Sequence, residues 1–220
     1  KKKDINRLSE AYYCQGRVLS ELSASEEALT AYLKAKELVR ETSDRDLEAR
    51  INNHLGTLYW ENGRTEKSLS CYKEAYRNYE MEQNKIGMTN TLRNIGKSMH
   101  GLEKLDSAYF YLDRAFVFAK NENLESQMAY ILSSMGSIYA EKGLYEKALA
   151  YQKESLNYSR IQNTKSSCYY AIGESYVNIQ KLDSALLYVD SALMSKDLYV
   201  KCSANWLLYT ICFKKQDYKK

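Results

Sequence analysis

Proline is absent from this chain, and glycine is scarce, at nine of 220 residues. Both residues punctuate turns and loops, so their scarcity disfavours loop-rich β-sandwiches and disordered linkers. Long apolar runs are also missing, since no unbroken stretch approaches the roughly 18 residues that a membrane-spanning helix needs. The sequence therefore predicts a chain that is nearly all helix, with no membrane span in this segment.

Residues that usually carry catalysis or hold metals are few and scattered. The two histidines, His54 and His100, have no acid or cysteine at metal-ligand spacing, which argues against a metal site or a catalytic triad. The string from Ile95 to Ser98 matches the end of a phosphate-binding loop, but Thr91 stands where its leading glycine would be. No carboxylate is set apart for general acid–base catalysis. We expect no enzyme, no metal and no cofactor.

Cysteine usage and charge give little sign of a special compartment or partner. The five cysteines are odd in number and none are paired at metal-ligand spacing, so no disulfide framework is predicted. A reducing, cytoplasmic setting is the default for such a chain, and a periplasmic one is also compatible. The formal net charge is +4, but five lysines lie at the chain ends, and without them the body carries −1. Because nucleic-acid-binding folds carry a basic stripe on their body, we expect no nucleic acid to bind this segment.

A repeat of about forty residues runs through the chain. It is marked by five glycines whose spacings are 40, 40, 40 and 37 residues, namely Gly16, Gly56, Gly96, Gly136 and Gly173. A second small residue follows each glycine by twelve positions, and these are Ala28, Ser68, Ala108, Ala148 and Ala185. A third follows seven positions later, at Ala35, Ala75, Ala115, Ser155 and Ala192. A fixed period of this length indicates a repeat architecture.

The spacing of the small residues predicts a pair of helices in every repeat. A glycine on the first helix lets a second helix approach closely, and the two later small residues lie two turns apart on one stripe of that second helix. Turn-like strings such as Glu61-Asn62-Gly63 separate the two helical segments. Each repeat is therefore predicted to be an antiparallel helical hairpin.

The pattern Leu-Gly-x-x-Tyr, followed by alanine, an aromatic and alanine, resembles the tetratricopeptide repeat, most clearly over 53–75 and 134–155. The resemblance implies an all-α, right-handed superhelical solenoid. The period exceeds the usual 34 residues and the closing proline is absent, which is similar to the long repeats of kinesin light chains, of animal regulators that bind G-protein motifs, and of bacterial peptide-sensing regulators. It implies a single array over 1–220, with repeats at about 9–48, 49–88, 89–128, 129–165 and 166–201. The first helix of a sixth repeat would follow at 202–220, so we expect a fragment of a longer protein.

The resemblance also implies a concave groove, lined by one stripe of each first helix. The residues expected there are Tyr13, Arg17, Arg50, Asn53, Trp60, Asn90, Arg93, Asn94, Lys97, His100, Tyr130, Tyr170, Asn178 and Trp206. The first half of this stripe is cationic and the second half is aromatic. That composition suits a protein or peptide partner with an acidic portion and apolar anchors.

Two classes of function fit these observations. The first is a protein- or peptide-binding module, either a scaffold or the sensing part of a larger, bacterial regulatory protein. The alternative is a purely structural spacer or oligomerisation element without a specific ligand. A chaperone-tail clamp is disfavoured, because the groove positions lack the required lysine, asparagine and arginine set. We also expect weak self-association through about 200–213, where Leu208, Ile211 and Cys212 would lack a covering helix.

Overall fold

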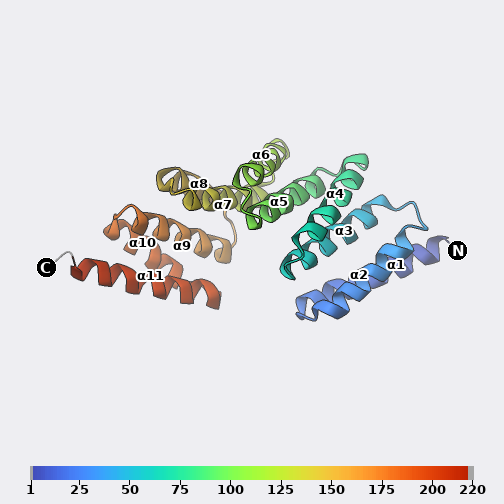
Figure 1. The fold of residues 1–220 in the computed structure, drawn as a ribbon, viewed down its shortest axis with the longest axis horizontal. Helices are drawn as coiled ribbons and strands as arrows, with labels where there is room; N and C mark the ends of the chain where they lie inside the picture. The colour runs from blue at the N-terminus through green and yellow to red at the C-terminus, as the bar shows by residue number, and fades with distance from the viewer. Residues whose placement is uncertain (1, 218–220) are drawn as a thin grey trace. The chain divides into compact units, whose positions relative to one another are not determined.

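The computed structural model describes residues 2–217, apart from the side chains of residues 163, 216 and 217. Within that range all regular structure is helical (Figure 1). The eleven helices are α1 (Lys2–Glu21), α2 (Ser25–Val39), α3 (Arg45–Glu61), α4 (Thr65–Met81), α5 (Lys85–Gly101), α6 (Leu105–Asn121), α7 (Glu125–Glu141), α8 (Tyr145–Tyr158), α9 (Gln162–Asn178), α10 (Leu182–Leu193) and α11 (Leu198–Asp217). The all-α prediction is confirmed. The terminal lysines at 1, 219 and 220, and the end of the expected sixth-repeat helix, lie outside the described residues.

The chain forms two compact units, an N-terminal unit of residues 1–118 and a C-terminal unit of residues 119–220. In the N-terminal unit α1 packs with α2 and α3 with α4, while α2 also contacts α3 and α4 contacts α5. In the C-terminal unit the corresponding pairs are α7 with α8 and α9 with α10, and α10 packs against α11 (Figure 1). Each unit is thus a stack of helical hairpins in which the second helix of one pair touches the first helix of the next.

The five repeat glycines each admit the side chain that follows sixteen residues later in the sequence. These facing pairs are Gly16 with Tyr32, Gly56 with Tyr72, Gly96 with Leu112, Gly136 with Gln152, and Gly173 with Val189. A Cβ atom placed on Gly56 would lie 2.5 Å from Tyr72 Cε1, and one on Gly96 would lie 2.8 Å from Leu112 Cγ. Such contacts are shorter than van der Waals packing allows, so the glycines permit the close helix crossings that their spacing predicts.

Most connections between helices share one turn with a left-handed residue. That residue has a positive φ, and the seven are Ser23, Gly63, Gln83, Glu103, Asn123, Gly143 and Gln180. The next N–H then bonds back into the helix, as Arg64 N does to Tyr59 O at 2.7 Å and Asn84 N to Tyr79 O at 2.9 Å. This is the C-terminal capping turn that satisfies otherwise unpaired helix carbonyls. Turns of this kind need no proline.

The one short interval of the repeat, 37 residues between Gly136 and Gly173, comes from a shortened helix. Helix α8 has 14 residues, whereas α4 and α7 each have 17. Ser159, the residue after the last one of α8, is extended, and α9 begins three residues after Ser159. The loss of about one helical turn removes three residues, and α9 still packs on α8.

Helix α11 corrects the expectation of an uncovered stripe at the end of the chain. Ile211 is fully buried, and Leu208 packs against the core formed by α9, α10 and α11. The side chains that α11 exposes are instead Trp206, Tyr209 and Phe213, together with Cys212. The expectation was wrong for Leu208 and Ile211, because α11 turns its Ile211 side toward α9 and α10, whereas Cys212 is exposed as expected.

Candidate peptide-binding face

The fourteen predicted groove residues fall into two sets on different units. Ten of them lie in the N-terminal unit on α1, α3 and α5, and α3 contacts both of the other two helices. The remaining four, Tyr130, Tyr170, Asn178 and Trp206, lie in the C-terminal unit on α7, α9 and α11. Below, the α1–α3–α5 face means the side chains of Arg17, Arg50, Asn53, Trp60, Asn90, Arg93, Asn94, Lys97 and His100.

Tyr13 is a platform beneath this face and not part of its exposed surface. Only 4% of Tyr13 is exposed, and the guanidinium carbons of Arg50 and Arg17 lie 5.2 and 6.0 Å from its ring centre. His54 meets the Tyr13 ring edge-on at 5.3 Å and also lies 5.8 Å from Tyr32. Burial raises the pKa of Tyr13, against the opposing effect of the two arginines. Burial also lowers the pKa of His54, so a neutral imidazole is favoured there.

The two arginines over Tyr13 differ in their electrostatic surroundings. Arg50 Nε lies 3.0 Å from Asp46 Oδ2, and Arg50 Nη2 lies 3.9 Å from Glu10 Oε1. The Nε contact is an ion pair without good hydrogen-bond geometry, since Nε has no hydrogen-bond partner. Arg17 is exposed and has no carboxylate partner among the residues that the structure describes. Arg17 is therefore the more available of these two cations.

A chain of amide groups links α3 to α5. Asn53 Oδ1 accepts a hydrogen bond from Asn94 Nδ2 at 3.3 Å and also lies 3.3 Å from Thr91 Oγ1, whose single hydroxyl proton is shared with Gly87 O at 2.8 Å. Arg93 Nη2 in turn donates to Asn94 Oδ1 at 3.4 Å. The distances to the amide groups are at the long end for hydrogen bonds, so the amide groups are oriented but remain able to exchange partners. Asn90 lies on the same helix, one turn before Asn94, and is partly buried.

Trp60 on α3 and Lys97 on α5 are a second pair of contacting residues in the α1–α3–α5 face. Lys97 Nζ lies 4.8 Å from the centre of the Trp60 ring, a cation–π geometry. Lys97 is exposed by area, but desolvation of its ammonium group lowers its pKa, and the charge of Arg93 lowers it further, while Glu61 has a weaker, opposite effect. The Trp60 indole nitrogen approaches Gly101, where an added Cβ would lie 3.5 Å from it. His100, next to Gly101, is partly buried.

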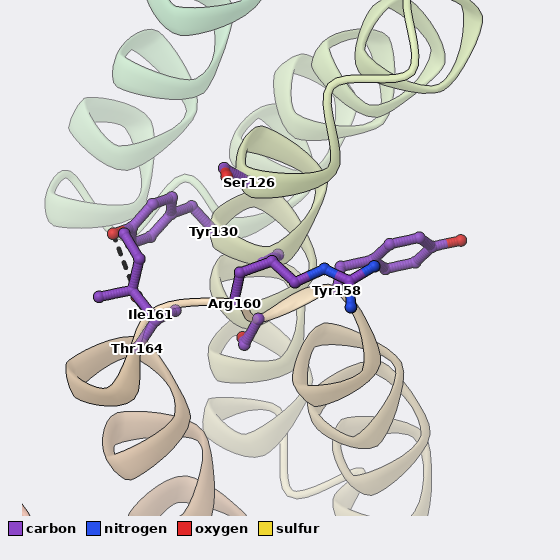
Figure 2. A pocket seen from close by; sticks show the side chains of 8 residues that line it. Ser126, Tyr130, Tyr158, Arg160, Ile161 and Thr164 are labelled. Carbon is purple, nitrogen blue, oxygen red and sulfur yellow. Dashed lines mark hydrogen bonds between the residues drawn. The ribbon is translucent and has the colours of Figure 1, made fainter.

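The predicted residues of the C-terminal unit are engaged locally. Tyr130 shares a hydrogen bond of 3.1 Å with the Thr164 hydroxyl across a pocket of about 10 Å³, room for one water at most (Figure 2). Tyr170 donates to Glu174 Oε1 at 3.1 Å, and burial together with that carboxylate raises its pKa to about 12. Asn178 Nδ2 donates to the backbone oxygen of Glu174. Trp206 differs from them, because 71% of it is exposed and its ring lies 5.7 Å from that of Tyr209.

Sequence reasoning missed the partners that hold the α1–α3–α5 face together. Asp46 precedes Arg50 by four residues on one helix, a spacing that favours ion pairs, so this contact could have been predicted from the sequence. Thr91 on α5 contacts Asn53 on α3, and no spacing in the sequence predicts that contact. In the described part of the chain no cluster of three or more potential metal ligands occurs. None of the described helices combines the length and apolarity needed to cross a membrane.

Comparison with known proteins places these helices in a known repeat fold. Residues 7–81 and 129–161 match family models described as tetratricopeptide repeat. Erythroid differentiation-related factor 1 of Homo sapiens is 32% identical over 98 residues, which are 43% of this chain and 8% of that protein. The chain therefore spans a small part of this relative.

Solved structures resemble the chain over most of its length. Aspartyl phosphate phosphatase F from Bacillus subtilis superposes with a TM-score of 0.80 at 19% identity, covering 89% of this chain and 53% of that one. The Rap conjugation gene regulator of plasmid pLS20, in complex with the Phr* peptide, gives 0.73 at 16% identity, covering 83% and 51%. At these identities the likeness shows a shared helical repeat fold, and this chain spans about half of each neighbour.

Proposed function

The chain is a tetratricopeptide repeat protein, and we propose that it is a binding module that holds a protein or peptide segment against its α1–α3–α5 face. The observation that carries this proposal is the row of polar, cationic and aromatic side chains on three successive first helices that the core does not use. Arg17 and Lys97 are exposed, and Asn53 and Trp60 are only partly buried. A structural spacer has no need for such a row.

The chemistry of the face suits an extended segment. Such a segment leaves its own N–H and C=O groups unpaired, and an asparagine amide can donate to one and accept from the other. The loosely bonded amides of Asn53 and Asn94 lie where they could do this. Arg17 and Lys97 would attract acidic side chains, and Trp60 would supply an aromatic anchor. The proposed module performs no catalysis.

A regulatory setting is also part of the proposal. The structure of the pLS20 regulator, which shares this fold, holds a peptide, and this supports peptide capture as the work of the α1–α3–α5 face. We infer that the chain is a scaffold or the sensing part of a larger regulatory protein. We also propose that its repeats form a single continuous array.

The test is selection of peptides from a random display library on the immobilised chain, followed by affinity measurement. Arg17→Ala and Trp60→Ala should each weaken the selected peptides by about tenfold, the equivalent of 1.4 kcal/mol. Matched controls are Arg77→Ala on α4 and Phe110→Ala on α6, both exposed away from this face, which should change affinity by less than about twofold. Selected peptides that bind Trp60→Ala and Arg17→Ala as tightly as the parent would refute the proposal, and so would a library that yields no binder.

A further inference from the structure

Helix α11 of the C-terminal unit has two apolar sides. One side, which includes Ala204 and Ile211, is fully buried in the core of that unit. The opposite side is exposed and carries four aromatic residues. Their exposed fractions are 80% for Tyr199, 71% for Trp206, 60% for Tyr209 and 55% for Phe213. A contiguous exposed apolar surface of this kind marks an interaction site.

The exposed residues follow the spacing of a coiled-coil seam. They recur at alternating intervals of three and four residues, which are the a and d positions of a heptad. We call them the α11 seam, and its members are Tyr199, Cys202, Trp206, Tyr209 and Phe213. The flanking e and g positions are uncharged, being Ser203, Asn205, Thr210 and Cys212. Two identical seams can therefore meet without repulsion between like charges.

The α11 seam also contains a hole of the kind that coiled-coil packing requires. Cys202, Asn205, Trp206 and Tyr209 line a hollow of about 530 Å³. They occupy positions i, i+3, i+4 and i+7 of the helix, and four residues so arranged form the hole that receives one knob side chain. The ring centroids of Trp206 and Tyr209 are 5.7 Å apart, and those of Tyr209 and Phe213 are 6.4 Å apart. An aromatic knob suits this hole, because ring pairs add to the stabilisation from burial.

Tyr209 argues against a helix that covers α11 as α10 covers α9. The residues of α9 that lie 36 positions before seam residues include Ser166, Gly173 and Val177, and all three are buried. Gly173 leaves room there for Val189 of α10. Tyr209 follows Gly173 by 36 residues, so a helix placed on α11 in the same way would collide with the tyrosine ring. A facing helix must instead accept Tyr209 as a knob.

We propose that α11 is a self-association surface, on which two copies of the chain pair through antiparallel α11 helices. Position a opposes position d in such a pair, so Trp206 of one copy faces Tyr209 of the other, and Phe213 faces the small Cys202. A parallel pair would set each bulky ring against its own copy. Antiparallel pairing also places opposite ends of the two helix dipoles side by side. This pairing goes beyond the proposed function and does not depend on it, because it uses the C-terminal unit.

The available area suits a weak, reversible dimer. An aromatic side chain offers about 150–250 Å² of surface, so the exposed parts of the four aromatic seam residues amount to about 500 Å² per copy. Two copies would bury about 1,000 Å², which is the lower limit for a specific interface. The dimer should therefore form in a concentration-dependent way.

Sedimentation velocity of the whole chain over a range of concentrations tests the association. The parent should form a dimer, and Trp206→Glu should weaken it about a hundredfold, because each dimer loses two anchors at about tenfold each. The matched control is Leu187→Glu on α10, which is also 71% exposed but lies outside the seam. It should leave the dissociation constant within about twofold. A parent that stays monomeric at about 1 mM, or a control as disruptive as Trp206→Glu, would overturn the proposal.

Disulfide trapping tests the direction of the pair. With Cys14→Ser and Cys212→Ser in place, Cys202 is the one exposed cysteine among the described residues. Mild oxidation with copper–phenanthroline should then trap little dimer, because the two Cys202 side chains lie in different layers of an antiparallel pair. Adding Phe213→Cys should give a disulfide between Cys202 of one copy and the new thiol of the other, located by mass spectrometry of the cleaved chain. Further addition of Trp206→Glu should abolish it.

Two trapping results would contradict antiparallel pairing. One is efficient trapping through Cys202 alone, which indicates a parallel pair, and the other is no disulfide after Phe213→Cys. Far-ultraviolet circular dichroism of each variant separates lost pairing from lost folding. Peptide binding at the α1–α3–α5 face is measured separately, so either proposal can fail while the other stands.

Discussion

Asn52 on α3 offers a sharp test of how the repeat core is built. It is fully buried, and neither Oδ1 nor Nδ2 has a hydrogen-bond partner among the described residues. The same position of the next repeats, four residues before the glycine, holds Leu92 and Leu132, each 1% exposed. Asn52 is therefore a polar residue in a place where its counterparts are apolar.

Replacing Asn52 by leucine should stabilise the protein. An unsatisfied buried polar group costs about 1–3 kcal/mol, and leucine has the same number and branching of side-chain heavy atoms as asparagine. The methyl groups of leucine are larger than the amide atoms, so packing strain offsets part of this stabilisation. We expect a net increase of about 1–2 kcal/mol in the free energy of unfolding, or a rise of roughly 2–8 °C in melting temperature.

The neighbouring residue supplies the control. Asn53 is partly buried, accepts a hydrogen bond from Asn94 and lies within reach of the Thr91 hydroxyl, so Asn53→Leu should destabilise by about 0.5–1.5 kcal/mol. Urea unfolding followed by circular dichroism measures both variants, with an unchanged m value as the sign that stability alone has changed. If Asn52→Leu loses more than about 1 kcal/mol, the Asn52 amide is satisfied in the native protein and the reasoning is wrong.

Three further predictions follow from packing, titration and exposure. Gly96→Leu should collide with Leu112 and lower stability by about 1–3 kcal/mol or more, and an unchanged urea midpoint would contradict the assigned helix contact. Burial lowers the pKa of His54 below its usual 6.5. As the pH falls, His54 is therefore protonated in the unfolded chain before it is protonated in the folded protein. Stability should therefore fall as the pH drops below about 6.5, and His54→Phe should flatten that dependence in urea titrations across the same range. Weak self-association through α11 should be lost in Trp206→Glu and Tyr209→Glu, and a parent chain that sediments as a monomer at high concentration would exclude it.

The fold was predictable because close helix packing restricts particular positions to small residues. Gly56 must face Tyr72 for α3 and α4 to meet, and that requirement repeats often enough to be read from spacing alone. The turns were harder to predict from the sequence, because Gln83 and Glu103 adopt left-handed conformations that favour glycine. The packing of the helices that they join sets the left-handed conformation of these two residues, and their own backbone preferences do not.

The candidate face was predictable as a set of positions but not as a set of interactions. Helical periodicity brought Arg17, Arg50 and Lys97 to first-helix stripes. It could not show that Glu10, forty residues from Arg50 in sequence, approaches that arginine, or that Tyr13 is buried beneath it. Both facts depend on how α1 lies against α3. Ile211 was misplaced for the same reason, because the packing of α11 on its neighbours sets which side is exposed.

The most direct test of the account is the salt dependence of binding. A peptide selected on the parent chain should be titrated against the parent, Arg93→Ala and the control Arg77→Ala, at about 0.01 and 0.15 M salt. Affinity should fall with salt for the parent and for Arg77→Ala. Arg93→Ala should bind more weakly at low salt and show a flatter salt dependence, because a cation of the α1–α3–α5 face has been removed. Parent and Arg93→Ala affinities that coincide at both salt concentrations would contradict the claim that this face receives the partner.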